Sequence, residues 1–97
     1  MNVHILDRAK EDLAAGYQFY DEQEGGLGMI FLKSLLADIE KLESNAGIHP
    51  IYHEPYYQML ATTFPHAIYY LIENNEVLID AVIDCRRGPD WISERLN

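Results

Sequence analysis

Apolar residues recur every three or four positions along two stretches in the first half of the chain. The first stripe contains Ala9, Leu13, Tyr17 and Tyr20. The second contains Leu27, Phe31, Leu35, Ile39 and Leu42, and it is widened by Leu32 and Leu36. This spacing places each stripe along one side of an α-helix. The glycine-rich segment 25–28 separates the stripes, so the pattern predicts an antiparallel helical hairpin with a short turn.

The segments that flank the hairpin carry shorter signals. Residues 3–6 are β-compatible, and Asp7 is suited to cap the first helix. Glu11 and Asp12 then lie in or near the first turn, where the helix dipole favours acids. Residues 44–50 contain Asn, Gly and Pro and are expected to form a loop.

Tyrosines and β-branched residues dominate the second half of the chain, which is typical of strands. We predict strands over residues 56–64, 67–73 and 76–84. Asn74 and Asn75 are expected to form a tight hairpin turn between the last two strands, because asparagine tolerates positive φ. Pro89 can open a short helical turn at the C-terminus that contains Trp91, Ile92 and Leu96.

Strict alternation along the last strand would divide its side chains between two faces. The expected core face, packed on the helical hairpin, carries Val77, Ile79, Ala81, Ile83 and Cys85. The opposite face carries Leu78, Asp80, Val82, Asp84 and Arg86. The elements together predict an α+β fold, with the N-terminal helical hairpin packed on one side of a three- to four-stranded antiparallel sheet. Residues 1–97 are expected to form one domain.

The charge balance bears on the partners that the protein can bind. The net charge is −9, with 16 acidic residues against 7 basic ones, and this field opposes the approach of nucleic acid. No apolar run reaches the roughly 20 residues that span a bilayer, and no secretion signal is evident. The single cysteine excludes an internal disulfide. These features favour a cytoplasmic protein.

Four short motifs, taken in order, resemble the RelE/ParE superfamily, the toxin halves of bacterial toxin–antitoxin and plasmid-stabilisation pairs. They are the segment Ala9–Leu13, the turn Gly26-Leu27-Gly28 followed by Phe31 and Leu32, the strand start Phe64-Pro65-His66, and the closing set Arg86, Arg87, Pro89, Trp91 and Arg95. The similarity covers nearly the whole chain.

The departures from that family concern its cations. Relatives commonly carry arginine or lysine in the strand before the Phe-Pro element, where this chain has Tyr57, Gln58, Thr62 and Thr63. Asp84 stands where relatives often have a histidine. RelE-like ribonucleases need cations and an acid–base pair, and a full set is not evident here. The resemblance therefore implies the ParE-like branch, whose members are associated with inhibition of DNA gyrase.

Arg86, Arg87, Trp91 and Arg95 are the candidate partner-binding residues. The two adjacent arginines could bind phosphate or an acidic antitoxin segment. Alternatively, Arg86 pairs with Asp84 on its own strand face, which would neutralise it. Arg87 points to the other face and has no such neighbour.

Catalytic and metal-binding chemistry has weaker candidates. His66, Arg86 and Arg87 are the possible catalytic residues, although a half-exposed strand position is the more common role for such a histidine. His49 and His53 are four residues apart, but Pro50 and Pro55 place them in a loop, so we expect no metal site. No cofactor is implied. Cys85 is expected to be packed and unreactive.

Three hypotheses for the function follow from the sequence. The first is the toxin component of a type II toxin–antitoxin system, ParE-like, with a cognate antitoxin as partner and DNA gyrase as the target that the resemblance implies. The second is an attenuated, non-toxic relative that acts as a protein-interaction module. The third is a ribosome-dependent mRNA endonuclease, which the missing cations disfavour; whether the protein is an enzyme stays open.

Overall fold

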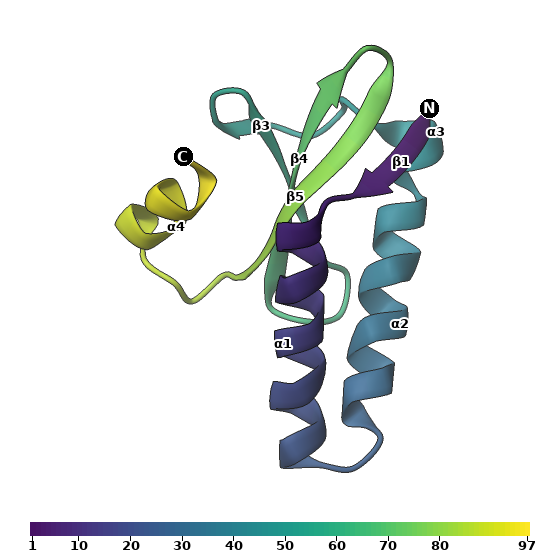
Figure 1. Ribbon diagram of the computed structural model, residues 1–97, viewed down its shortest axis with the longest axis vertical. Helices are drawn as coiled ribbons and strands as arrows, with labels where there is room; N and C mark the ends of the chain where they lie inside the picture. The colour runs from purple at the N-terminus through teal and green to yellow at the C-terminus, as the bar shows by residue number, and fades with distance from the viewer.

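The two predicted helices form an antiparallel hairpin that packs on a β-sheet in the computed structural model, which describes residues 1–97 (Figure 1). The elements in chain order are β1 (Asn2–Ile5), α1 (Asp7–Gln23), α2 (Leu27–Glu40), α3 (Leu42–Asn45), β2 (Ile51–His53), β3 (Tyr56–Leu60), β4 (His66–Glu73), β5 (Glu76–Asp84) and α4 (Pro89–Leu96). The α+β class predicted from the sequence is confirmed.

The sheet is larger than expected, and it is mixed. Its five strands lie in the order β1-β5-β4-β3-β2, and β1 pairs with β5 in parallel while the other pairs are antiparallel. The prediction of a purely antiparallel sheet of three or four strands was therefore wrong in these respects. β1 corresponds to the segment 3–6 that the sequence marked as β-compatible, whereas β2 has only three residues, too few for an alternating pattern to identify it.

The structure confirms one predicted turn and differs from the prediction at two element boundaries. Asn74 and Asn75 do form the β4–β5 turn with φ of 51° and 62°, as predicted. The strand expected over residues 56–64 ends at Leu60, because Asp38 of α2 accepts hydrogen bonds from the Thr62 amide (2.9 Å) and hydroxyl (2.7 Å) and holds that loop. Asp7 is the first residue of α1 and makes no side-chain cap hydrogen bond, so its predicted N-cap role was wrong.

An extra residue in β5 changes the expected division of its side chains. Tyr69 pairs with Ala81 and the next residue, Tyr70, pairs with Ile79, so Asp80 is an extra residue in β5. Such a bulge reverses the faces that follow it. Val77, Ile79 and Val82 consequently face the hairpin, whereas Ala81 and Ile83 face α4. The prediction that Ala81, Ile83 and Cys85 share the hairpin face was wrong.

The sheet is covered on both faces, not on one as the sequence suggested. The larger core lies between the sheet and the α1–α2 hairpin, and it includes Phe31, Leu35, Ile68, Tyr70 and Val77. The smaller core lies under α4 and contains Ala67, Tyr69, Ala81, Ile83, Ile92 and Leu96. The C-terminal segment is thus a two-turn helix with its own buried face.

Close contact between the two long helices depends on a glycine. A Cβ atom placed on Gly28 would lie 2.6 Å from the Tyr17 carbonyl oxygen and 2.8 Å from Asp21 Cβ, so no larger residue fits without moving α1. The Asp21 carboxylate also accepts hydrogen bonds from the amides of Gly26 and Gly28 and closes the turn.

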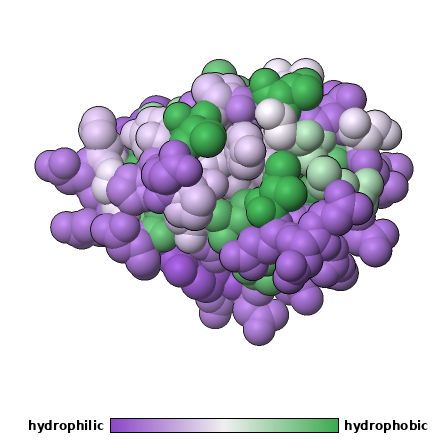
Figure 2. Space-filling view, turned by 90° about the horizontal axis from the view of Figure 1, so that it is seen from above, coloured by the Kyte–Doolittle hydropathy of each residue, from purple (hydrophilic) through white to green (hydrophobic).

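The face of the molecule seen in Figure 2 is mostly hydrophilic. Seen from the end that carries the β4–β5 turn, apolar residues reach the surface as separate spots among polar side chains (Figure 2). No helix is long and apolar enough to cross a membrane.

Trp91 contributes less to the attachment of α4 than Ile92 and Leu96 do. It is 42% exposed, whereas Ile92 and Leu96 are 6% and 2% exposed. We therefore expect Ile92→Ala to lower the free energy of unfolding by about 2–4 kcal/mol. Trp91→Ala should cost about 1 kcal/mol or less, because it removes mainly a surface contact. Urea unfolding of both variants measures the difference; a Trp91→Ala loss equal to that of Ile92→Ala would contradict this packing.

Candidate binding cleft

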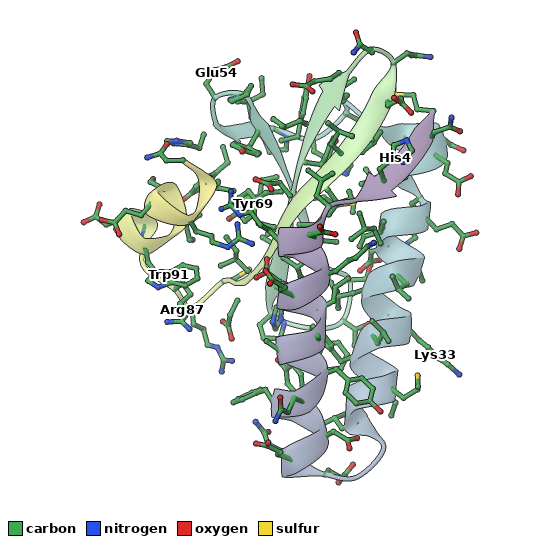
Figure 3. The ribbon with its side chains drawn as sticks, in the orientation of Figure 1. His4, Lys33, Glu54, Tyr69, Arg87 and Trp91 are labelled. Atoms are coloured by element: carbon green, nitrogen blue, oxygen red, sulfur yellow. The ribbon has the colours of Figure 1, made fainter.

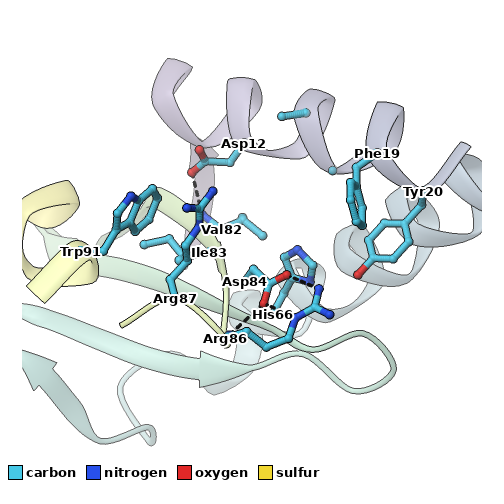
Figure 4. Close-up of a pocket in the computed structure, with 12 residues that line it drawn as sticks. Asp12, Phe19, Tyr20, His66, Val82, Ile83, Asp84, Arg86, Arg87 and Trp91 are labelled. Carbon is cyan, nitrogen blue, oxygen red and sulfur yellow. Dashed lines mark hydrogen bonds and ion pairs between the residues drawn. The ribbon is translucent and has the colours of Figure 1, made fainter. Parts of the chain in front are cut away.

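An open cleft of about 560 Å³ lies between α1 and the C-terminal end of β5, with α4 on its far side (Figure 4). Its lining residues are Asp12, Ala15, Gly16, Phe19 and Tyr20 from α1, His66 from β4, Val82, Ile83 and Asp84 from β5, and Arg86, Arg87 and Trp91 beyond that strand. Most of the candidate residues from the sequence therefore line one cleft, and aromatic side chains of α1 line it as well.

Arg86 is paired with Asp84, which is the second of the two alternatives that the sequence left open. Its Nε donates to Asp84 Oδ1 at 2.9 Å, and Nη2 donates to Oδ2 in a two-pronged contact. The Arg86 amide donates to Asp84 Oδ1 as well, at 2.8 Å. The hydrogen bonds from Arg86 hold the pKa of Asp84 at about 2, and the same pair raises the pKa of Arg86. The Asp84 carboxylate therefore offsets the positive charge of Arg86.

Arg87 differs from Arg86 in having no acidic partner. Its side chain forms no ion pair, and its Cζ lies 4.4 Å from the centre of the Trp91 ring (Figure 3). Both residues are exposed at the rim of the cleft. A guanidinium stacked on an indole keeps its charge and its hydrogen-bond donors available to a ligand.

Arg95 is turned inward, toward α1 and β5. Its Nη2 donates to Asp12 Oδ2 at 2.7 Å, and Arg8 donates in turn to the Arg95 carbonyl oxygen. Asp12 also accepts the Val82 amide at 2.9 Å. Burial raises the pKa of Asp12, although the Val82 amide and Arg95 oppose that shift. The contacts of Arg95 thus join α4 to α1 and β5.

His66 is buried, not half-exposed as its place after a proline suggested. It is 8% exposed, it packs against the rings of Phe31 and Tyr20 at 5.0 and 6.0 Å, and its Nδ1 has no hydrogen-bond partner. Burial lowers the pKa of His66, with Asp84 acting in the opposite direction. A neutral imidazole in an aromatic pocket can accept a proton only at a cost in solvation.

The remaining candidate groups lie apart from one another. Cys85 is exposed, so the prediction of a packed thiol was wrong, although partial burial and the nearby Asp84 raise the pKa of its thiol. His49 Nδ1 lies 2.6 Å from the Tyr70 hydroxyl, and His53 Nε2 lies 3.0 Å from Asn97 Oδ1. No group of three or more His, Cys, Asp and Glu side chains is placed to hold a metal ion.

The wall of the cleft that α1 provides was not predicted from the sequence. Phe19 is 50% exposed and packs edge-on against Tyr20, with ring centres 5.1 Å apart. A signal was present, because Phe19 is an aromatic residue outside the apolar stripe of its helix. Asp12 was read only as a first-turn acid, and its contacts depend on residues about 70 and 83 positions away.

Comparison with known proteins supports the fold. No family model matches the sequence, and no curated protein matches it. A chain of the solved structure described as "Chromosomal ParDE TA system from P. aeruginosa" superposes with a TM-score of 0.81, covering 87% of this chain and 95% of that chain, at 16% sequence identity. At this identity the likeness concerns the fold. The RelE/ParE resemblance of the sequence is confirmed at that level.

The Asp84–Arg86 pair predicts a pH dependence of stability. The pKa of Asp84 is about 2 in the folded protein and near 3.8 when unfolded, so the unfolded state binds more protons between these values. The stabilisation is present above about pH 4 and is lost as the pH falls toward 2. Arg86→Met should therefore reduce the slope of the free energy of unfolding across this window in urea titrations, while Arg87→Met should leave it unchanged. Equal slopes for wild type and Arg86→Met would contradict the pairing.

Proposed function

We propose that this protein is the ParE-like toxin component of a type II toxin–antitoxin pair and that a cognate antitoxin neutralises it. The observation that carries the proposal is the likeness in fold, over most of both chains, to a chain of the ParDE toxin–antitoxin system. The order of the motifs along the sequence, ending in the paired arginines and Trp91, supports the same function independently of that superposition.

The cleft favours binding over RNA cleavage. A ribonuclease of this kind needs cations to stabilise the charge that develops at phosphorus, and an acid–base pair to move the protons. Asp84 offsets Arg86, and His66 is buried with a lowered pKa. Arg87 alone remains an unpaired cation at the rim. The net charge of −9 further opposes the binding of RNA. The cleft therefore does not support the mRNA endonuclease hypothesis.

A protein target fits the cleft better than a nucleic acid does. Arg87 stacked on Trp91, with Phe19 and Tyr20 across the cleft, presents one cation among aromatic surfaces, a combination that is enriched where proteins bind proteins. DNA gyrase, the target associated with ParE-like proteins, is the target we propose to test first.

The attenuated interaction module is the second candidate. It is favoured by one specific observation, the bidentate neutralisation of Arg86, which leaves the site with half of the charge that its arginine pair would supply. The two candidates share the fold and the antitoxin-like partner and differ in whether the protein alone stops growth.

Induced expression in a bacterial host separates these candidates. We expect the wild type to arrest growth and Arg87→Ala to abolish or strongly weaken the arrest, because Arg87 is the available cation. Arg86→Ala, the matched control at the adjacent position, should retain most of the effect. Equal phenotypes for the two variants would contradict the assignment of Arg87.

The nature of the arrest identifies the process that fails. Pulse labelling should show that DNA synthesis stops before protein synthesis if gyrase is the target. An earlier loss of protein synthesis, with cleaved mRNA, would instead revive the endonuclease hypothesis. Wild-type protein that is soluble, folded and harmless would overturn the toxin proposal and leave the interaction module.

A further inference from the structure

His66 places a titratable group in a pocket that an apolar ring would fill better. Its imidazole packs against Tyr20 and Phe31, and its Nδ1 is buried without a hydrogen-bond partner. A buried polar atom without a partner costs stability, so packing alone favours phenylalanine at this position. The imidazole therefore points to a role beyond filling the core.

Three of the segments around His66 present groups that titrate or carry charge. α1 presents Tyr20, β5 presents Asp84, and the segment after β5 presents Arg86, whereas α2 contributes only the apolar ring of Phe31. His66 and Asp84 are partners in the β4–β5 register, and both line the cleft together with Arg86 (Figure 4). The Asp84 carboxylate is thus a neighbour of two basic side chains, the imidazole and the guanidinium.

The two basic side chains differ in how well water can solvate them. While His66 is neutral, both oxygens of Asp84 accept hydrogen bonds from Arg86. A proton on His66 would place a second cation beside the same carboxylate. The buried imidazolium needs this counter-charge more than Arg86 does, because the Arg86 side chain is 67% exposed and water can replace its partner. Protonation of His66 should therefore weaken the Asp84–Arg86 pair.

We propose that His66 is a positioning residue for Arg86: protonated His66 takes the Asp84 carboxylate as its partner, and the released guanidinium joins Arg87 in binding an anionic group in the cleft. The cleft then offers one available cation at neutral pH and two in acid. Two guanidinium groups suit an oxyanion or a pair of carboxylates. This control acts on the cleft whichever target the cleft binds, so it does not rest on the toxin assignment.

An NMR titration of the histidine ring signals tests the coupling between these three side chains. Asp84 stays ionised in the folded protein down to its pKa of about 2, so its charge is constant while His66 titrates. Arg86→Met should raise the pKa of His66, because it removes a repelling cation and frees the carboxylate. Asp84→Asn should lower it. A His66 that stays neutral until the protein unfolds, or that shifts in the same direction in both variants, would overturn the proposal.

Sulfate binding tests the release of Arg86, since sulfate keeps its charge throughout this pH range. At constant ionic strength, the wild type should bind sulfate at least about fivefold more tightly on the acid side of the His66 transition than on the neutral side, because a second charge-assisted contact becomes available. Binding and protonation are linked reciprocally, so sulfate should also raise the pKa of His66 more in the wild type than in Arg86→Met.

Two variants should lose the acid-dependent gain, and one should keep it. His66→Phe keeps an aromatic ring in the pocket but cannot take a proton, and Arg86→Met has no guanidinium to release. The matched control is His4→Phe, because His4 is an exposed histidine that pairs with Glu76 and does not line the cleft. Melting curves at each pH establish that the variants fold, and His66→Leu replaces His66→Phe if the latter does not.

The sulfate result separates this switch from general effects of acid and from the toxin function. Equal gains in the wild type and His66→Phe would show that acid acts through the charge of the whole protein, and the proposal would fail. A gain that survives in Arg86→Met would assign the anion to other residues and would also contradict it. A wild type that is harmless in the growth assay leaves the sulfate result valid, because sulfate reports the cation and not the target.

Discussion

The extra residue in β5 is the constraint on which the rest of the structure depends. Asp80 has no partner in β4. The alternation of side chains between the two faces of the sheet is therefore reversed after Asp80. Val82 can then pack against the hairpin while Ile83 packs against α4. A strand without the bulge would send Asp84 to the α4 face. The bulge instead brings Asp84, Arg86 and the cleft to the side where α1 passes.

A polar network around Asp12 satisfies a backbone amide, that of Val82, which the bulge and the short β1 leave without a partner strand. β1 ends opposite Ile79, so the Val82 amide has no neighbouring strand on that side, and Asp12 accepts its hydrogen bond. Burying the Asp12 carboxylate raises its pKa, and Arg95 offsets part of that cost while tying α4 to α1. The Asp12 carboxylate that satisfies the Val82 amide therefore also holds α4, which lies on the far side of the cleft. The stability of the fold and the shape of the cleft depend on the same contacts.

Features that depend on local periodicity could be predicted from the sequence. Features that depend on contacts between residues far apart in the chain could not. The two helical stripes, the Asn74–Asn75 turn and the limits of β5 were predicted correctly. The Asp84–Arg86 pair was one of the two alternatives that the placement of both residues on one strand face left open. Alternation could not reveal the bulge, because Ala81 and Val82 are both apolar and either could face the hairpin. The sequence likewise could not reveal the contact between Arg95 and Asp12, because the two residues lie 83 positions apart.

The fold alone does not decide the function, because one architecture can hold different sites. The cleft and the roles of its arginines depend on the placement of β5 between two cores, and methyl NOE spectroscopy measures that placement most directly. We predict cross-peaks from Ile83 to Ile92 and Leu96, and from Val82 to side chains of α1. Cross-peaks from Ile83 to α1 and from Val82 to α4 would show a strand without the bulge, and they would contradict both the cleft and the roles assigned to its arginines.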